Sequence, residues 1–143
     1  MPIEIIDLDE GKGNLAIGSG VFSGKEYIDA LKRHLEQDKE KFKKYKYSLT
    51  DLTAVTETKE WPNSVIDECV YLCREAAQIN LHAVVAIAAD LDFLFGLSRM
   101  WEFQMDETGW DIMVFKTRDA AEKWIKKTVK DKFGIEGLTF GST

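Results

Sequence analysis

Residues 81–89, with the sequence LHAVVAIAA, form a continuous apolar run of the length of a β-strand. Such a run is typical of a central strand in a parallel sheet, where both faces are buried. Asp90 and Asp92 interrupt the apolar residues that follow, so the segment falls short of the roughly 18 apolar residues that indicate a membrane span. The run therefore favours an α/β fold with helices packed on a sheet.

Strand-like and helix-like segments alternate on both sides of this run. Ser23 and Glu26 have the spacing of a helix capping box, Pro62 is placed to open a second helix, and Asp90 is the expected cap of a third. We expect further strands at residues 3–9, 15–20, 45–52 and 109–115, and helices at residues 23–37, 62–77, 91–105 and from 117 onward. The order ββαβαβαβα predicts one domain, residues 1–143, with a mostly parallel sheet and an antiparallel first strand.

Composition excludes several classes of function. A net charge of −6 and a pI near 5.0 argue against nucleic-acid binding, because affinity for phosphates comes mainly from Lys and Arg. The two cysteines, Cys69 and Cys73, share one helix face with apolar residues, which favours packing over a metal site or a disulfide framework. No signal peptide is visible at the N-terminus. We expect a cytoplasmic protein without a cofactor or a metal.

The motifs of common enzymes and nucleotide-binding proteins match poorly. The glycine-rich segment GSGVFSG, residues 18–24, follows a strand and precedes a helix, but its spacing is wider than that of a dinucleotide-binding loop. No nucleophile elbow or zinc-protease motif is present. Asp51, Asp90 and Arg99 are the candidates for an acid/base or anion site. We therefore predict a non-enzymatic protein and keep a small enzyme that uses these three residues as an alternative.

The third expected helix carries two apolar faces. On a helical wheel, its predicted core face consists of Phe93, Leu94, Leu97, Met100 and Trp101. A second stripe, Phe95, Arg99 and Phe103, has four-residue spacing, which places its members side by side on a helix. Aromatic residues and Arg are enriched in binding hot spots. A neighbouring loop or the C-terminal tail is the alternative cover for this stripe, and otherwise we expect a partner, a ligand or a second copy of the chain.

Two segments carry a resemblance to a known family. The segments FGLSRMWE, residues 95–102, and VFKTRDAAEKWI, residues 114–125, together with the order of elements, resemble the SpoIIAA-like proteins. These belong with the STAS domains (sulphate transporter and anti-sigma-factor antagonist), whose fold is related to the lipid-binding CRAL-TRIO domain. The resemblance covers nearly the whole chain and implies a SpoIIAA-like (STAS-like) fold and a binding or regulatory role.

The resemblance also suggests where such a protein acts. Regulatory STAS domains carry a phosphorylated serine in the loop after the third strand, and DLTAVTE, residues 51–57, matches the start of that loop. The expected serine and glycine are missing here, although Thr56 and Thr58 offer hydroxyl groups. We therefore predict a loop lined by Asp51, Thr53 and Thr56, beside the stripe of Phe95, Arg99 and Phe103, that contacts a protein or a small ligand.

Two further expectations concern partners. The lipid-binding relatives imply an apolar pocket beneath the helices, so a binding protein for a lipid or another apolar small molecule is the first alternative. The stripe on the third helix predicts a homodimer.

Overall fold

A mixed sheet runs through the middle of the protein. The computed structural model describes residues 3–141. The strands follow one another in chain order across the sheet: β1 (Ile3–Leu8), β2 (Gly13–Ser23), β3 (Tyr47–Lys59), β4 (Val84–Ala88) and β5 (Asp111–Phe115). β1 is antiparallel to β2, and the other neighbours are parallel. The predicted α/β class, the mostly parallel sheet and the antiparallel first strand are confirmed.

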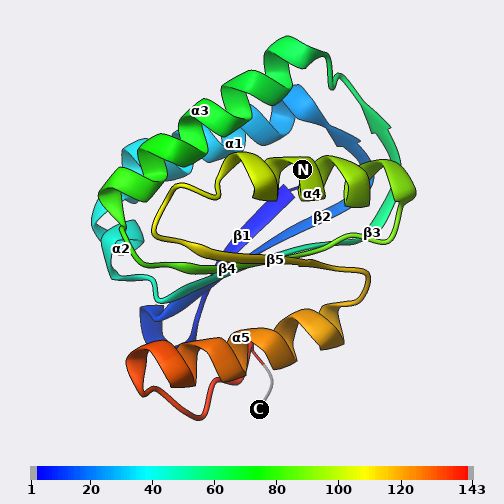
Figure 1. Ribbon diagram of the computed structural model, residues 1–143. Coiled ribbons are helices and arrows are strands. Elements are labelled where there is room, and N and C mark those ends of the chain that lie inside the picture. The colour runs from blue at the N-terminus through cyan, green and yellow to red at the C-terminus, as the bar shows by residue number, and fades with distance from the viewer. Residues whose placement is uncertain (1–2, 142–143) are drawn as a thin grey trace.

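The strand order decides where the helices lie. The helices are α1 (Gly24–Gln37), α2 (Lys39–Lys44), α3 (Asn63–Ile79), α4 (Asp92–Gln104) and α5 (Arg118–Phe133). Each parallel connection from β2 to β5 steps in the same direction, and such crossovers are right-handed. α1, α3 and α4 therefore share one face of the sheet with α2, whereas α5 covers the other face (Figure 1).

β4 is an interior strand of the sheet, paired with β3 and β5, as the apolar run at residues 81–89 predicts. All five of its residues are buried. Val84 and Ala86 pack in the core beneath α5, whereas Val85 and Ile87 face the layer of α1, α3 and α4. Burial of both faces explains why the strand has no polar alternation.

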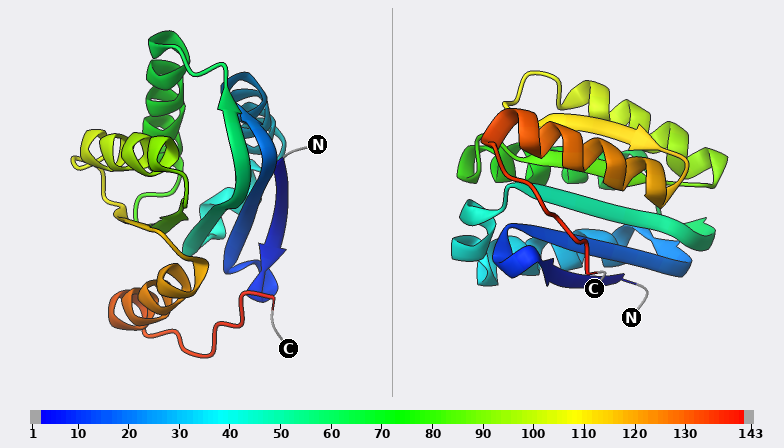
Figure 2. Two further views of the ribbon diagram at one scale, coloured as in Figure 1. Left: turned by 90° about the vertical axis from the view of Figure 1, so that its right-hand side faces the viewer. Right: turned by 90° about the horizontal axis from the view of Figure 1, so that it is seen from below.

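The face opposite α1 is closed by α5 and the C-terminal segment. Residues 134–141 run back from the end of α5 toward β1 (Figure 2). Leu138 and Phe140 are buried there, and the ring centroid of Phe140 lies 5.2 Å from that of Tyr47. The C-terminal segment is therefore part of the core, whereas its sequence suggested a short edge strand or a loose end.

β2 and β3 are longer than expected, which removes two predicted loops. β2 continues to Ser23 through two shifts of register near Gly18 and Gly20, and β3 continues to Lys59. The glycine-rich segment is therefore strand up to Ser23, in keeping with its poor match to a dinucleotide-binding loop. Residues 53–59, the expected loop, alternate along a strand instead.

The helical layer departs from the sequence prediction in three places. α2, the Lys-rich residues Lys39–Lys44, was not among the expected helices. α4 begins at Asp92 with Leu91 at the N-cap position, so Asp90 is not its cap. The buried face of α4 is rotated toward Leu94 and Ser98, which are buried, whereas Phe93 and Met100 are exposed. Ser98 is polar and lies just outside the core face predicted from the helical wheel, yet it is buried.

Candidate functional site

A cavity of about 140 Å³ lies between the sheet and the helices α1, α3 and α4. It exists because α1 and α3 pack largely on each other: one buried cluster consists of Ile28, Val65, Cys69, Cys73, Ala77 and Met105, which all come from the helical layer. The cavity floor is formed by side chains of β1 to β4, among them Ile3, Ala16, Ser48, Thr50 and Val85. Small side chains in the middle of the floor leave the space open.

Aromatic residues surround the two ends of the cavity. At one end, the ring centroid of Phe22 lies 5.6 Å from that of Tyr27 and 5.5 Å from that of Trp61. At the other end, Phe42, Tyr45 and Trp110 line the space. Aromatic side chains provide large rigid apolar surfaces, so both ends suit a flat or bulky apolar group.

The cavity lining contains no Asp, Glu, Lys or Arg side chain among the described residues. Tyr27 and Cys69 both line it, and their pKa values are raised, that of Tyr27 by burial and that of Cys69 by a hydrogen bond with Cys73 and by burial. Both groups are therefore neutral at neutral pH. An ion placed in such a space would lose its hydration without gaining a partner, so the cavity favours a neutral ligand.

A second, polar hollow of about 330 Å³ adjoins the cavity between β1 and α1. Ile3, Ile5, Ala30 and His34 line both spaces. The outer hollow adds two acidic and three other polar side chains: Asp7, Asp38, Arg33, Gln37 and Lys41. Because the two spaces share a wall and Ile5 is exposed, we expect a ligand to enter the cavity from this side, between β1 and α1.

Asn14 and His34 lie at the boundary of the two spaces. Asn14 Nδ2 lies 3.3 Å from His34 Nε2, and His34 Nδ1 lies 3.2 Å from an oxygen of Asp38. The His34 ring is stacked on Tyr45 with 5.9 Å between the centroids. The hydroxyl of Tyr45 donates to Asp7 at 2.6 Å, and burial, together with this bond, raises the pKa of Tyr45. Both rings are held in place.

The stripe predicted on the third helix is divided by the structure. Phe95 is half-buried and packs against the core cluster that includes Leu94 and Val114. The ammonium group of Lys116 lies 4.4 Å from the centroid of the Phe95 ring. Arg99 and Phe103 are exposed, and Arg99 Nε lies 3.6 Å from a carboxylate oxygen of Glu102. The C-terminal segment lies on the other side of the sheet and does not cover them.

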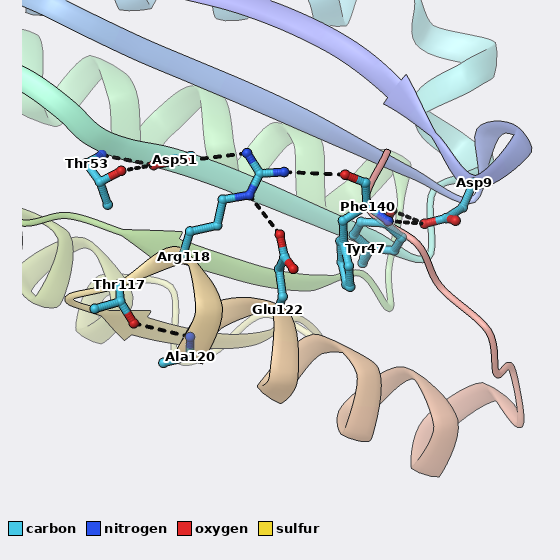
Figure 3. A network of polar contacts seen from close by, with 9 residues as sticks. All are labelled: Asp9, Tyr47, Asp51, Thr53, Thr117, Arg118, Ala120, Glu122 and Phe140. Carbon is cyan, nitrogen blue, oxygen red and sulfur yellow. Dashed lines mark hydrogen bonds and ion pairs between the residues drawn. The ribbon is translucent and has the colours of Figure 1, made fainter. Parts of the chain in front are cut away.

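Asp51 and Thr53 face α5, on the opposite side of the sheet from the cavity (Figure 3). Both the backbone N–H and the hydroxyl of Thr53 donate to Asp51, at 2.9 and 2.7 Å. Arg118 bridges Asp51 to Glu122 and to the carbonyl oxygen of Phe140. These contacts hold α5 and the C-terminal segment on the sheet.

The predicted site residues are therefore not brought together. Thr56 is exposed farther along β3, Asp51 and Thr53 belong to the α5 face, and Arg99 and Phe103 lie on the outside of α4. A binding role for the loop residues and a binding role for the stripe on α4 therefore stay two separate predictions. Of the three candidates for acid/base chemistry, Asp90 is exposed between β4 and α4, whereas Asp51 and Arg99 lie on different faces of the sheet.

Sequence reasoning missed the cavity residues because their signal is weak. Ser48 and Thr50 alternate with Tyr47 and Leu49 on β3, and alternate residues of a strand point to opposite faces. The small polar members of this alternation point to the cavity, and the large apolar members fill the core beneath α5. Asn14 and His34 are far apart in sequence and carry no joint motif.

The arrangement of strands and helices defines an α/β protein with a SpoIIAA-like fold. Its likeness to a solved structure supports this: an uncharacterized protein of the DUF3478 family with a SpoIIAA-like fold from Shewanella loihica PV-4 superposes with a TM-score of 0.55. The two sequences are 15% identical, and the likeness covers 86% of this chain and 91% of the other. The fold implied by the sequence resemblance is thereby confirmed.

Comparisons of the sequence itself add nothing to this assignment: no protein-family model and no curated protein matches the chain. Within residues 3–141, no helix combines the length and the apolar character that crossing a membrane requires. The same residues contain no group of His, Cys, Asp and Glu side chains that could hold a metal ion. The cytoplasmic location stays a prediction from the sequence.

Proposed function

We propose that the protein is a non-enzymatic binding module that holds a neutral apolar small molecule between the sheet and the helices. The uncharged cavity of about 140 Å³ carries this proposal. A cavity of about 150 Å³ with an apolar lining is large enough for benzene, so the bound group is about the size of one ring or a short branched chain. Ligand sites in general combine such apolar walls with a few polar groups.

The positions of the ionisable residues support binding over catalysis. Asp51 is held by Thr53 and Arg118, and Arg99 pairs with Glu102 on the outer surface of α4. Neither side chain reaches the cavity lining. A binding module therefore uses the space beneath the helices, and the charged network opposite fixes the C-terminal segment.

Toluene tests this proposal because it matches the size and the polarity of the cavity. We expect Thr50→Leu, which fills the floor, to weaken toluene binding at least about tenfold, the equivalent of 1.4 kcal/mol. Thr56→Leu is the matched control, because it makes the same change on the same strand outside the cavity, and it should bind like the wild type. Thermal shift and calorimetric titration measure the affinity.

Retained ligand provides a second measurement. Native mass spectrometry of protein purified from its cells should show a mass above that of the bare chain. Absence of toluene binding by the wild type, together with masses equal only to whole multiples of the chain, would contradict the proposal.

We also propose that the outer face of α4 forms a homodimer contact. Phe93, Met100 and Phe103 are exposed to 51%, 42% and 80%, and Gly96 lies between them with open space around its Cα. Residue 98 is the midpoint both of Phe93 and Phe103 and of Gly96 and Met100. Two antiparallel copies of α4 that pack through their outer faces, with the two-fold axis at the level of residue 98 along the helix, would place Phe93 against Phe103 and Met100 against Gly96.

Such a pattern is self-complementary, as a two-fold interface requires. We expect Phe103→Glu to weaken the dimer about 100-fold, because aromatic side chains in an interface are frequent hot spots and a buried carboxylate opposite Phe93 would have no partner. Tyr71→Glu, a change of another exposed aromatic on α3, is the control and should leave the dimer intact. Light scattering over a range of concentrations measures the effect. A monomeric wild type would rule out this interface.

A further inference from the structure

Asn14 contains a buried polar atom with no partner among the described residues. Its side chain lines the cavity, and the residue is only 5% exposed. Asn14 Nδ2 faces His34 Nε2 at 3.3 Å, whereas Asn14 Oδ1 is buried and makes no hydrogen bond. Buried polar atoms of folded proteins are nearly always paired with protein, water or ligand. The unpaired oxygen therefore indicates a place where another molecule completes the site.

The hydrogen-bond chain determines which kind of group fits. His34 Nδ1 faces the Asp38 carboxylate at 3.2 Å and so carries the proton it donates, while His34 Nε2 accepts from Asn14. Asn14 Oδ1 is then an acceptor and requires a donor. If the amide is turned over, His34 Nε2 has to carry a proton and donate it to Asn14 Oδ1, and the amide nitrogen is then the unpaired atom that requires an acceptor. A hydroxyl group can both donate and accept, and it satisfies either arrangement.

The surroundings disfavour an anionic group at the same place. A carboxylate has no proton to donate to Asn14 Oδ1, and the acidic side chains of Asp7 and Asp38 stand close by. Of the two cations that line the polar hollow, Lys41 lies 3.3 Å from a carboxylate oxygen of Asp7, whereas Arg33 is exposed and makes no ion pair among the described residues. The pKa of Asp7 is lowered, chiefly by the hydrogen bond from Tyr45, so this carboxylate is charged at neutral pH.

We propose that the ligand is a ring-sized alcohol or phenol whose hydroxyl binds Asn14, with its apolar ring in the cavity. This inference rests on the proposed function and names the class of ligand. The hydroxyl would lie at the boundary between the apolar cavity and the polar hollow, next to the entrance between β1 and α1. Asn14 therefore determines specificity, and His34 orients its amide.

Three probes that share one ring test the inference: phenol, toluene and benzoate. Trp61, Trp101 and Trp110 line the cavity, whereas Trp124 packs against Phe115 on the other face. The indole N–H signals of the first three should shift with a bound ring, and that of Trp124 should stay in place. NMR titration of the wild type should give an affinity for phenol about tenfold above that for toluene, the effect of about one hydrogen bond. Benzoate should bind least.

Asn14→Leu removes the polar partner and keeps the number and branching of the heavy atoms in the side chain. We expect it to abolish the preference for phenol and to leave toluene binding close to that of the wild type. Thr50→Val is the matched control, because it removes a hydroxyl from the same cavity away from Asn14, and it should keep the preference. In the wild type, the side-chain amide signals of Asn14 should shift with phenol and not with toluene, which tests the contact even if Asn14→Leu does not fold.

The outcomes separate the two proposals. Binding of none of the three probes would overturn the proposed function. Equal binding of phenol and toluene by the wild type, or a preference that survives Asn14→Leu, would overturn the role of Asn14 while the cavity remains a binding site. Tightest binding of benzoate would overturn the alcohol class and indicate an acid. Amide signals of Asn14 that do not respond to phenol would likewise contradict the contact.

Discussion

Replacement of Gly13 by alanine is expected to lower the free energy of unfolding by about 3 kcal/mol, the upper part of the range for overpacked cores. A Cβ atom at Gly13 would overlap the ring of Tyr47, which lies directly across it in the paired strands β2 and β3. Tyr47 is fully buried, its hydroxyl donates to Asp9, and its ring packs on Phe140. The ring therefore has no alternative position.

Gly96→Ala is the matched control for this experiment, measured at concentrations where the chain is monomeric because Gly96 lies in the proposed dimer contact. Gly96 lies inside α4 with no atom near an added Cβ, so alanine should raise the free energy of unfolding by about 1 kcal/mol through its greater helix propensity. The same chemical change is thus expected to act with opposite sign at the two positions. Urea denaturation by circular dichroism measures both. A stability of Gly13→Ala equal to that of the wild type would show that Tyr47 does not lie over Gly13.

Replacement of Asp9 by asparagine is expected to cost about 2 kcal/mol at neutral pH, the range for hydrogen bonds to a charged group. The carboxylate accepts from the hydroxyl of Tyr47, from the backbone N–H and hydroxyl of Thr139, and from the backbone N–H of Phe140. Asp9 has a φ of 51°, a conformation that asparagine tolerates. The substitution therefore tests the charge and adds little backbone strain.

The effect of Asp9→Asn should depend on pH. Burial opposes ionisation of Asp9, but the hydrogen bonds from Tyr47, Thr139 and Phe140 outweigh it, so its pKa is lowered. A carboxyl with a lowered pKa in the folded protein stabilises the fold above the pKa of the unfolded chain, about 4, and this contribution is lost as the pH falls through the folded value. The difference between wild type and variant should therefore shrink below about pH 4.

Asp119→Asn provides the control for this charge change. Asp119 pairs with Lys123 on the surface of α5, and both side chains are exposed, so its removal should change stability by less than about 0.5 kcal/mol at any pH. Guanidinium denaturation between acidic and neutral pH measures all three proteins. A constant difference between the wild type and Asp9→Asn over this range would contradict the proposed role of the Asp9 charge.

Residues 81–89 show how far local sequence can predict a fold. Residues 83–89 of this run contain no polar side chain and are all buried, so a strand buried on both faces could be predicted there, whereas Leu81 and His82 are exposed and precede β4. Thr117 likewise caps α5 as expected, since its hydroxyl accepts from the N–H of Ala120 at 3.2 Å. A buried strand and a helix cap depend on residues close together in the sequence, so the sequence alone is enough to predict them.

The errors on α4 have a physical cause. The helical wheel excluded Ser98 from the core because it is polar, and it included Phe93 and Met100 because they are apolar. Ser98 is buried beside the cavity, and both apolar residues are exposed. Apolar residues are common on protein surfaces, and Phe93 and Met100 are two of them. The wheel therefore identified a helix with an apolar face, but the face that is buried is rotated around the helix axis by nearly the angle between consecutive residues.

The candidate site was beyond the sequence for a different reason. Alternate residues of β3 point to opposite faces of the sheet, so Asp51 and Thr53 lie on the α5 face and Thr50 faces the cavity. Which of these two faces holds the cavity depends on where the helices pack. The sequence determined the elements, the parallel sheet and the burial of β4, because these follow from local patterns of apolar residues. The tertiary structure alone decided that α1 and α3 pack on each other and leave a cavity at Asn14 and His34, because that space results from contacts between residues distant in the chain.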